Sequence, residues 1–167
     1  MPPSTTDVSA QAWIGLGANL GDARATLVAA LAALGLLPDT SLLAASSVYR
    51  SAPVDSTGPD YLNAVARLET RLAPQALLVE LQRIEREHGR ERPYRNAPRT
   101  LDLDLLLHGD ARLATPTLTL PHPRLHERAF VIVPLAELAP ALVIPGRGAV
   151  AGLLGAVAGQ RVDKLLG

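Results

Sequence analysis

Two segments of the chain alternate between apolar and other residues, which is the pattern of a β-strand with two different faces. In residues 100–108 (TLDLDLLLH), leucines alternate with Asp102 and Asp104, so the two carboxylates share one face. In residues 61–70 (YLNAVARLET), small and apolar side chains alternate with a mixed face, whose members are Tyr61, Asn63, Val65 and Arg67. The shorter segments 12–16 and 42–50 predict two further strands.

Two other segments carry the composition and the end signals of helices. The first, ARATLVAALAAL, follows Asp22, which is a suitable N-cap, and stops before Gly35. The second starts at Pro74, which suits a first helical turn, and its apolar stripe stops before Gly89. A further helix is predicted around residues 128–138.

The predicted order is therefore β-α-β-β-α-β, which is the split unit of the ferredoxin-like fold. We expect an α+β protein in which helices pack on an antiparallel sheet. Residues 109–167 are expected to form a C-terminal α/β extension on the same core. The alternation of strand and helix at the start also fits a parallel, doubly wound sheet, and the sequence alone leaves both folds open.

The composition narrows the class of protein. A chain of 167 residues with 48% hydrophobic residues suits one domain, which we expect over residues 11–167 after a disordered tail at 1–10. The absence of cysteine excludes disulfides and thiolate chemistry. A net charge of +0 argues against nucleic-acid binding, and no targeting or membrane-spanning pattern is present, so we expect a cytoplasmic location without membrane partners.

The paired carboxylates are the strongest chemical signal in the chain. Asp102 and Asp104 would sit about 7 Å apart on a rigid strand, which suits Mg²⁺ completed by phosphate oxygens. The preceding segment, GRERPYRNAPR, carries Arg90, Arg92, Arg95 and Arg99, and guanidinium groups bind phosphate oxygens in a bidentate manner. Together they predict a polyphosphate–Mg²⁺ site, against the alternative of a solvated strand face beside a basic loop.

Three weaker signals accompany this pair. Aromatic residues make up only 3% of the chain, so Tyr61 beside Asn63 suggests a ring that stacks on a flat ligand whose edge the amide reads. His122 stands between two prolines and could donate to phosphate. The segment GLGANLG loosely matches a dinucleotide fingerprint, in which Arg50 would suit NADP.

These motifs together resemble the 6-hydroxymethyl-7,8-dihydropterin pyrophosphokinase family of folate biosynthesis. The resemblance runs from Trp13 to Lys164, and APRTLDLDLLLHGD is its most specific part. The other motifs follow in the family's order: GLGANLGD, SVYRSAPV, GPDYLNAV, QRIEREHGR and LPHPRLHERAF.

The resemblance implies a monomeric, ferredoxin-like enzyme that uses ATP as co-substrate with two Mg²⁺. It would transfer the diphosphate of ATP to the hydroxymethyl oxygen of the pterin and release AMP. Both metals would bind Asp102 and Asp104, and the catalytic residues would be these two with Arg90, Arg92 and Arg99. The implied pterin-binding residues are Asn19, Ser51, Ala52, Pro53, Val54, Tyr61, Asn63 and Phe130. The implied ATP-binding residues are Glu85, Arg90, Arg92, Arg99, Thr119, His122 and Arg128.

Two rival classes remain open at the level of the sequence. An NADP-dependent reductase could be built on the glycine-rich turn, and it would need no Mg²⁺. A ferredoxin-like module that binds RNA would need exposed aromatic and basic residues on its sheet, and its affinity would fall steeply with salt. The net charge and the carboxylates beside the expected site disfavour the second class.

Overall fold

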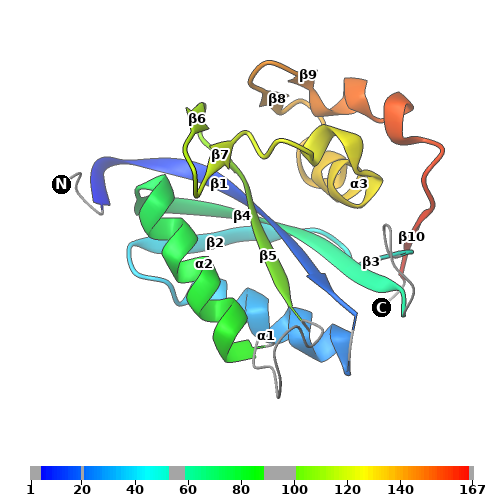
Figure 1. Ribbon diagram of the computed structural model, residues 1–167, viewed down its shortest axis with the longest axis horizontal. Coiled ribbons are helices and arrows are strands. Elements are labelled where there is room, and N and C mark those ends of the chain that lie inside the picture. The colour runs from blue at the N-terminus through cyan, green and yellow to red at the C-terminus, as the bar shows by residue number, and fades with distance from the viewer. Residues whose placement is uncertain (1–4, 20, 53–58, 89–100, 166–167) are drawn as a thin grey trace.

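The structure is a computed structural model, which describes residues 5–19, 21–52, 59–88 and 101–165. Within these residues, a six-stranded sheet has the order β10-β3-β4-β1-β5, and β2 also pairs with β4 (Figure 1). Its strands are β1 (Thr5–Ala18), β2 (Thr40–Ala45), β3 (Tyr49–Ser51), β4 (Tyr61–Leu72), β5 (Asp102–His108) and β10 (Val162–Lys164). Every pairing described in this sheet is antiparallel, which is contrary to a parallel, doubly wound fold.

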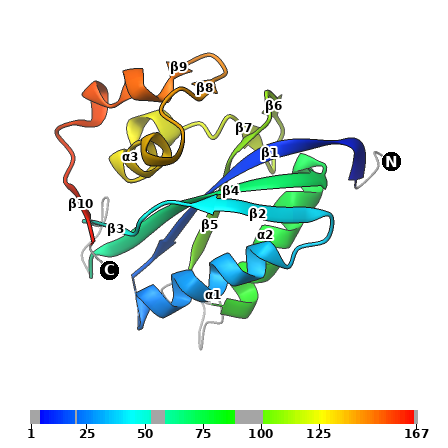
Figure 2. The ribbon, with the colours of Figure 1, turned by 180° about the vertical axis from the view of Figure 1, so that it is seen from behind.

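Helices cover both faces of the sheet. The first two, α1 (Ala23–Gly35) and α2 (Pro74–His88), lie on one face, and α3 (Ala129–Leu138) lies on the other (Figures 1 and 2). The predicted N-cap of α1 is confirmed, because the Asp22 carboxylate accepts a hydrogen bond from the Ala25 N–H at 3.0 Å. No helix among the described residues is long and apolar enough to cross a membrane.

The segment after β5 contains short elements around α3. Two hairpins, β6–β7 (Leu113–Ala114 and Thr119–Leu120) and β8–β9 (Val143–Ile144 and Gly148–Ala149), form two small sheets. Short 3₁₀ turns occupy Leu125–Glu127, Val150–Leu153 and Gly155–Val157.

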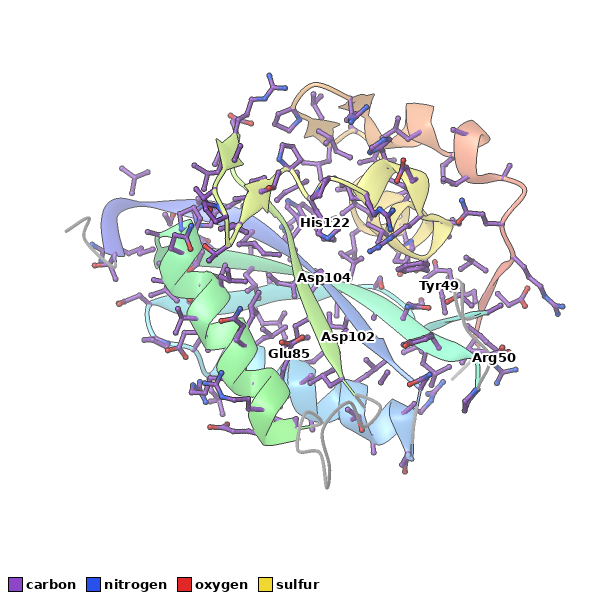
Figure 3. The ribbon with its side chains drawn as sticks, in the orientation of Figure 1. Tyr49, Arg50, Glu85, Asp102, Asp104 and His122 are labelled. Atoms are coloured by element: carbon purple, nitrogen blue, oxygen red, sulfur yellow. The ribbon has the colours of Figure 1, made fainter. Side chains whose placement is uncertain are left out.

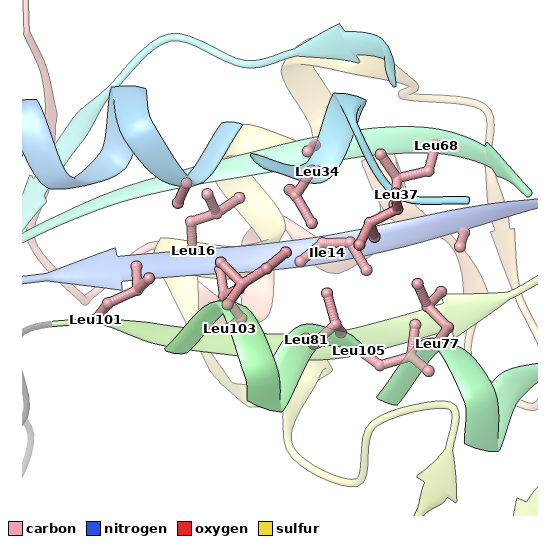
Figure 4. Close-up of a cluster of buried hydrophobic side chains, with 14 of the residues drawn as sticks. Ile14, Leu16, Leu34, Leu37, Leu68, Leu77, Leu81, Leu101, Leu103 and Leu105 are labelled. Carbon is pink, nitrogen blue, oxygen red and sulfur yellow. The ribbon is translucent and has the colours of Figure 1, made fainter. Parts of the chain in front are cut away.

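Two apolar cores explain the alternation seen in the sequence. The first lies between the sheet and the helices α1 and α2, and Leu16, Leu68, Leu81 and Leu103 are among its members (Figure 4). The second lies under α3 and contains Trp13, Val65, Ile132 and Leu135. Strand β4 therefore buries side chains on both faces, as its mixed pattern of Leu, Ala and Val indicates.

The leucines at the end of β5 belong to different cores because the strand contains a bulge. Trp13 pairs with Leu107 and Ile14 with Leu105, so Leu106 has no partner of its own in β1. Leu101, Leu103 and Leu105 face the first core, as predicted, whereas Leu106 and Leu107 both enter the second. The strict alternation therefore ends at Leu105.

Two predicted boundaries differ from the structure. Residues 5–10, which the sequence predicts as part of a disordered tail, form the start of β1, where Thr5 pairs with Leu72 and Ala10 with Thr70. This end of the strand is largely solvent-exposed, so polar residues such as Ser9 are tolerated there. The single strand predicted over residues 42–50 is divided into β2 and β3, because Ser46 leaves the regular ladder. Its hydroxyl accepts the Val65 N–H at 2.9 Å in place of a backbone carbonyl.

Candidate functional site

The two carboxylates lie side by side on β5, at one edge of the described sheet. Asp102 pairs with Gly17 and Asp104 with Gly15 of β1, and both carboxylates are half-buried. They line a cavity of about 330 Å³ on the face of the sheet that also carries α3. The predicted juxtaposition of the two side chains is therefore present, and Figure 3 shows them along one strand.

The glycines opposite the carboxylates belong to the floor of this cavity. A Cβ at Gly17 would lie 3.4 Å from the Asn63 Nδ2 and 3.7 Å from the Tyr61 ring, so a side chain there would crowd both residues. Gly15 and Gly17 lie inside strand β1, not in a turn between a strand and a helix. The dinucleotide fingerprint therefore lacks the structural context it requires.

The opposite wall of the cavity has the features of a site for a flat, polar ring. Tyr61 and Phe130 supply aromatic surface from β4 and α3, and Ser51 and Asn63 supply polar side chains, with Ala52 beside them. Ser51 Oγ donates to Asn63 Oδ1 at 2.6 Å, and both residues are buried. The amide oxygen is thereby occupied, which leaves the amide nitrogen to face the floor of the cavity at Gly17.

Arg128 closes the cavity beside Phe130. It occupies the N-cap position of α3, and its guanidinium carbon lies 5.5 Å from the centre of the Phe130 ring. This distance allows a cation–π interaction that fixes the arginine against the ring. A cation therefore stands next to the aromatic wall, in a cavity that the two carboxylates also line.

His122 is positioned as a neutral hydrogen-bond donor. Its backbone N–H donates to the Leu106 carbonyl at 2.9 Å, and its Nδ1 accepts the Arg124 N–H at 3.1 Å. The ring proton is therefore assigned to Nε2. Burial lowers the pKa of His122, the charges of Arg128 and Arg124 lower it further, and Asp104 opposes them. The imidazole is accordingly neutral near pH 7.

A second cavity, of about 270 Å³, lies against helix α2 and the β6–β7 hairpin. Its walls are apolar side chains, including Leu78 and Leu118, together with threonine hydroxyls such as that of Thr119. Asp104 and His122 line both this cavity and the first one. These two residues therefore stand where the two cavities meet, with His122 close to Asp104 in Figure 3.

Glu85 occupies a place that the sequence did not predict. It is buried on α2, and its Oε2 accepts the Leu103 N–H at 2.9 Å. Leu103 lies between the two aspartates, so Glu85 holds the peptide between Asp102 and Leu103. Glu85 is among the lining residues of neither cavity, and periodicity could not reveal this bond because it spans 18 residues.

The other residues expected at the site lie either outside the lining of the first cavity or outside the described residues. Asn19 lies just beyond β1 and outside the residues that line the first cavity, with its Nδ2 3.5 Å from the Pro59 carbonyl oxygen. Pro53, Val54, Arg90, Arg92 and Arg99 lie outside the described residues. The apolar and threonine lining of the second cavity was not predicted, apart from Thr119 and His122. Its only signal was the alternation of Thr and Leu over residues 117–120.

Comparison with known proteins points to a single family. The family described as 7,8-dihydro-6-hydroxymethylpterin-pyrophosphokinase matches residues 13–140. The 2-amino-4-hydroxy-6-hydroxymethyldihydropteridine pyrophosphokinase of Haemophilus influenzae is 47% identical over 155 residues, which cover 92% of this chain and 97% of that protein. The protein of the same name from Pseudomonas aeruginosa is 45% identical over 156 residues, which cover 93% and 96%.

Solved structures show the same fold at much lower identity. The wild-type HPPK-DHPS of Plasmodium falciparum with pteroate has a TM-score of 0.71 and 14% identity. The likeness covers 92% of this chain and 43% of that chain. This chain therefore spans less than half the length of that protein.

Proposed function

The chain belongs to the 7,8-dihydro-6-hydroxymethylpterin-pyrophosphokinase family, and on that premise we propose that the two adjoining cavities hold its two substrates. The enzyme transfers the diphosphate group of ATP to 6-hydroxymethyl-7,8-dihydropterin, which is a step of folate biosynthesis, and AMP is the other product.

The observation that carries the proposal is the position of Asp104 and His122 at the junction of the cavities. The first cavity, with Tyr61 and Phe130, suits the flat pterin. The second, with apolar walls and threonine hydroxyls, suits the nucleoside of ATP. Because a diphosphate moves between the two substrates, the reacting phosphorus must lie between their sites, and the junction of these two cavities satisfies this requirement.

The pair of carboxylates that includes Asp104 at this junction fits Mg²⁺. Two carboxylates on one strand face offer hard oxygen ligands and leave the remaining coordination positions to phosphate oxygens and water. We assign both proposed ions to Asp102 and Asp104. When bound, Mg²⁺ supplies neutralisation of the charge on the phosphate oxygens and fixes their orientation.

The reaction then requires mainly positioning and electrostatic stabilisation. The hydroxymethyl oxygen attacks the β-phosphorus, a new O–P bond forms, and the bond from this phosphorus to the α–β bridging oxygen breaks. That oxygen leaves with AMP, and the hydroxyl proton is released to solvent. His122 donates from Nε2 to a phosphate oxygen, and Arg128 adds a positive charge beside Phe130.

The arginine-rich segment at residues 89–99 is included in the proposed ATP site on the basis of its sequence. Arg90, Arg92 and Arg99 are proposed to bind the triphosphate, because guanidinium groups match phosphate oxygens and the segment leads directly into β5. Their roles remain predictions, as do those of Pro53 and Val54 at the pterin and of Glu85 and Asn19 near the site.

We also propose a more detailed assignment of the fold, together with a cellular location and an oligomeric state. The strand order and the two helices on one face support a ferredoxin-like βαββαβ unit, with the segment after β5 as its C-terminal α/β extension. A cytoplasmic monomer without nucleic-acid partners is proposed on the composition.

An assay with resolved nucleotide products tests this function. Purified protein, ATP, Mg²⁺ and 6-hydroxymethyl-7,8-dihydropterin should yield AMP and pterin diphosphate in equal amounts, with no ADP. Omission of the pterin should leave ATP intact. Stoichiometric ADP would indicate transfer of one phosphoryl group and would contradict the proposal. A parallel reaction with NADPH in place of ATP and Mg²⁺ should show no oxidation of the nicotinamide.

A further inference from the structure

Three residues outside the cavities form a hydrogen-bonded clip between α3 and the sheet. Tyr49 Oη donates to Glu137 Oε1 at 2.5 Å, while Ser47 donates to Glu137 Oε2 from its backbone N–H at 2.9 Å and from its hydroxyl at 3.2 Å. Glu137 belongs to α3, Tyr49 to β3, and Ser47 to the link between β2 and β3. The bonds therefore join segments that are nearly 90 residues apart.

Each partner of the clip belongs to an element that also carries a residue of the first cavity. Phe130 precedes Glu137 by seven residues on α3, which is two helical turns, so the two side chains leave the same side of the helix. Ser51 follows Tyr49 by two residues on β3, so these side chains also share a face, and both are buried.

The clip thus constrains the rotation of α3 about its own axis and its spacing from β3. The other end of α3 is held separately, since Gln160 accepts the Ala129 N–H at 2.9 Å and donates to the Glu127 carbonyl at 2.7 Å. One anchor alone would allow the helix to roll. A rotation of α3 would move Phe130 relative to Ser51 and Asn63. The width of the first cavity between Phe130 and these two residues would then change.

The protonation states of Tyr49 and Glu137 maintain the hydrogen bond between them near pH 7. The pKa of Tyr49 is raised far above its ordinary value by burial and then by Glu137, so the phenol keeps its proton. Burial pushes the pKa of Glu137 upward, but hydrogen bonds from Tyr49 and Ser47 and the charge of Lys164 outweigh it, so the carboxylate stays ionised near pH 7. A charged acceptor with a neutral donor makes this one of the stronger kinds of hydrogen bond.

We propose that Tyr49 and Glu137 are positioning residues for the pterin, because their bond sets the spacing between α3 and β3 that places Phe130 opposite Ser51 and Asn63. The inference rests on the proposed function of the first cavity. Neither residue lines either substrate cavity. Their effect is therefore expected on the pterin and not on ATP, whose proposed cavity is lined from α2, β5 and the β6–β7 region.

Calorimetric titration of the full chain separates these two ligands. Tyr49→Phe should raise the dissociation constant of the pterin alcohol about fivefold, the equivalent of one hydrogen bond, with the ATP value within about twofold of wild type. Glu137→Ala should have at least the same effect. Glu137→Gln should retain most of the pterin affinity, because the amide oxygen still accepts from Tyr49.

Two further variants keep the test decisive. Thr70→Val removes a buried hydroxyl at the far end of β4 and should lower thermal stability without a selective loss of pterin affinity. The double variant Tyr49→Phe with Glu137→Ala should bind the pterin no more weakly than Glu137→Ala alone. The proposal would be overturned if Tyr49→Phe left pterin affinity unchanged or if the affinities for pterin and ATP fell equally. It would also be overturned if the losses in the double variant were additive. If wild-type protein forms no AMP, the proposed function fails instead.

Discussion

Ser51 Oγ donates to Asn63 Oδ1 at 2.6 Å, across the pairing between β3 and β4, and this bond decides which end of the amide faces the first cavity. Because the amide oxygen is occupied, the NH₂ group is left to donate to an acceptor on the pterin that we propose for this cavity. Both residues are almost fully buried, at 6% and 4% exposure, so water cannot easily replace the missing partner if the bond is lost.

Ser51→Ala should therefore weaken pterin binding. The freed amide could rotate and present its oxygen, so we expect the dissociation constant of the pterin alcohol to rise about fivefold or more. Ser51→Thr keeps the hydroxyl and is the matched control. Calorimetry with pterin and with ATP gives the comparison, and a Ser51→Ala protein that binds pterin as wild type does would show that Asn63 needs no such support.

Asp102→Asn and Asp104→Asn should each abolish turnover and leave the fold intact. The substitution removes a negative charge that would hold Mg²⁺, and it also removes repulsion between two nearby carboxylates, so the free energy of unfolding should not fall. Formation of AMP over a series of Mg²⁺ concentrations measures the first effect, and chemical denaturation measures the second.

Asp110→Asn is the control for this pair, because Asp110 is exposed in the turn after β5 and lines neither cavity. It should retain wild-type activity. Near-normal turnover of Asp102→Asn or Asp104→Asn at high Mg²⁺ would instead place the metal elsewhere.

The sequence was sufficient to predict those features of the site that depend on which residues share one face of a single strand. The alternation over residues 100–105 placed Asp102 and Asp104 on one face, because burial of the three leucines on the other face leaves no alternative orientation. The same reasoning located Tyr61 and Asn63 on the face of β4 that lines the cavity. These features depend on local periodicity, which a sequence displays directly.

The sequence was insufficient where contacts depend on packing between distant segments. The bond of Glu137 to Ser47 and the bond of Glu85 to Leu103 join residues with no shared period. The bulge at Leu106 could not be seen either, since a leucine fits both faces of a strand that is buried on each side. The start of β1 looked disordered because its polar residues need no burial at a solvated end of the sheet.

Because Glu137 is ionised in the folded protein, we expect its contribution to folding stability to depend on pH. The pKa of this carboxyl is lower in the folded protein than in the unfolded chain, so it contributes stability above about pH 4.3, its unfolded value, and loses that contribution as the pH falls through the folded value. Wild type should therefore be more stable than Glu137→Gln at pH 6, and the gap should narrow below pH 4.3. Thermal unfolding at several pH values measures the gap, and a gap that is constant with pH would contradict it.

The contact of Glu85 with Leu103 supports both the edge of the sheet and the proposed metal site. Strand β5 has β1 as its only neighbour in the described sheet, so the Leu103 N–H on its open side needs another acceptor, which the carboxylate from α2 supplies. Glu85→Ala would leave this buried donor unpaired, at a cost of about 1–3 kcal/mol in the free energy of unfolding. Glu85→Gln keeps an oxygen acceptor and should lose less.

The same substitution should disturb the metal site, because the unpaired N–H belongs to the peptide between Asp102 and Leu103, which lies between the two carboxylate-bearing residues. We expect Glu85→Ala to need a higher Mg²⁺ concentration for half-maximal formation of AMP, whereas a purely structural role would reduce stability and leave the Mg²⁺ dependence unchanged. Glu87→Ala is the control on the same helix, since Glu87 is exposed and pairs with Arg83 at the surface. Its loss should cost less than about 1 kcal/mol and leave the Mg²⁺ midpoint in place. A shifted midpoint in Glu85→Ala that Glu85→Gln restores would tie the buried carboxylate to the spacing of the two aspartates.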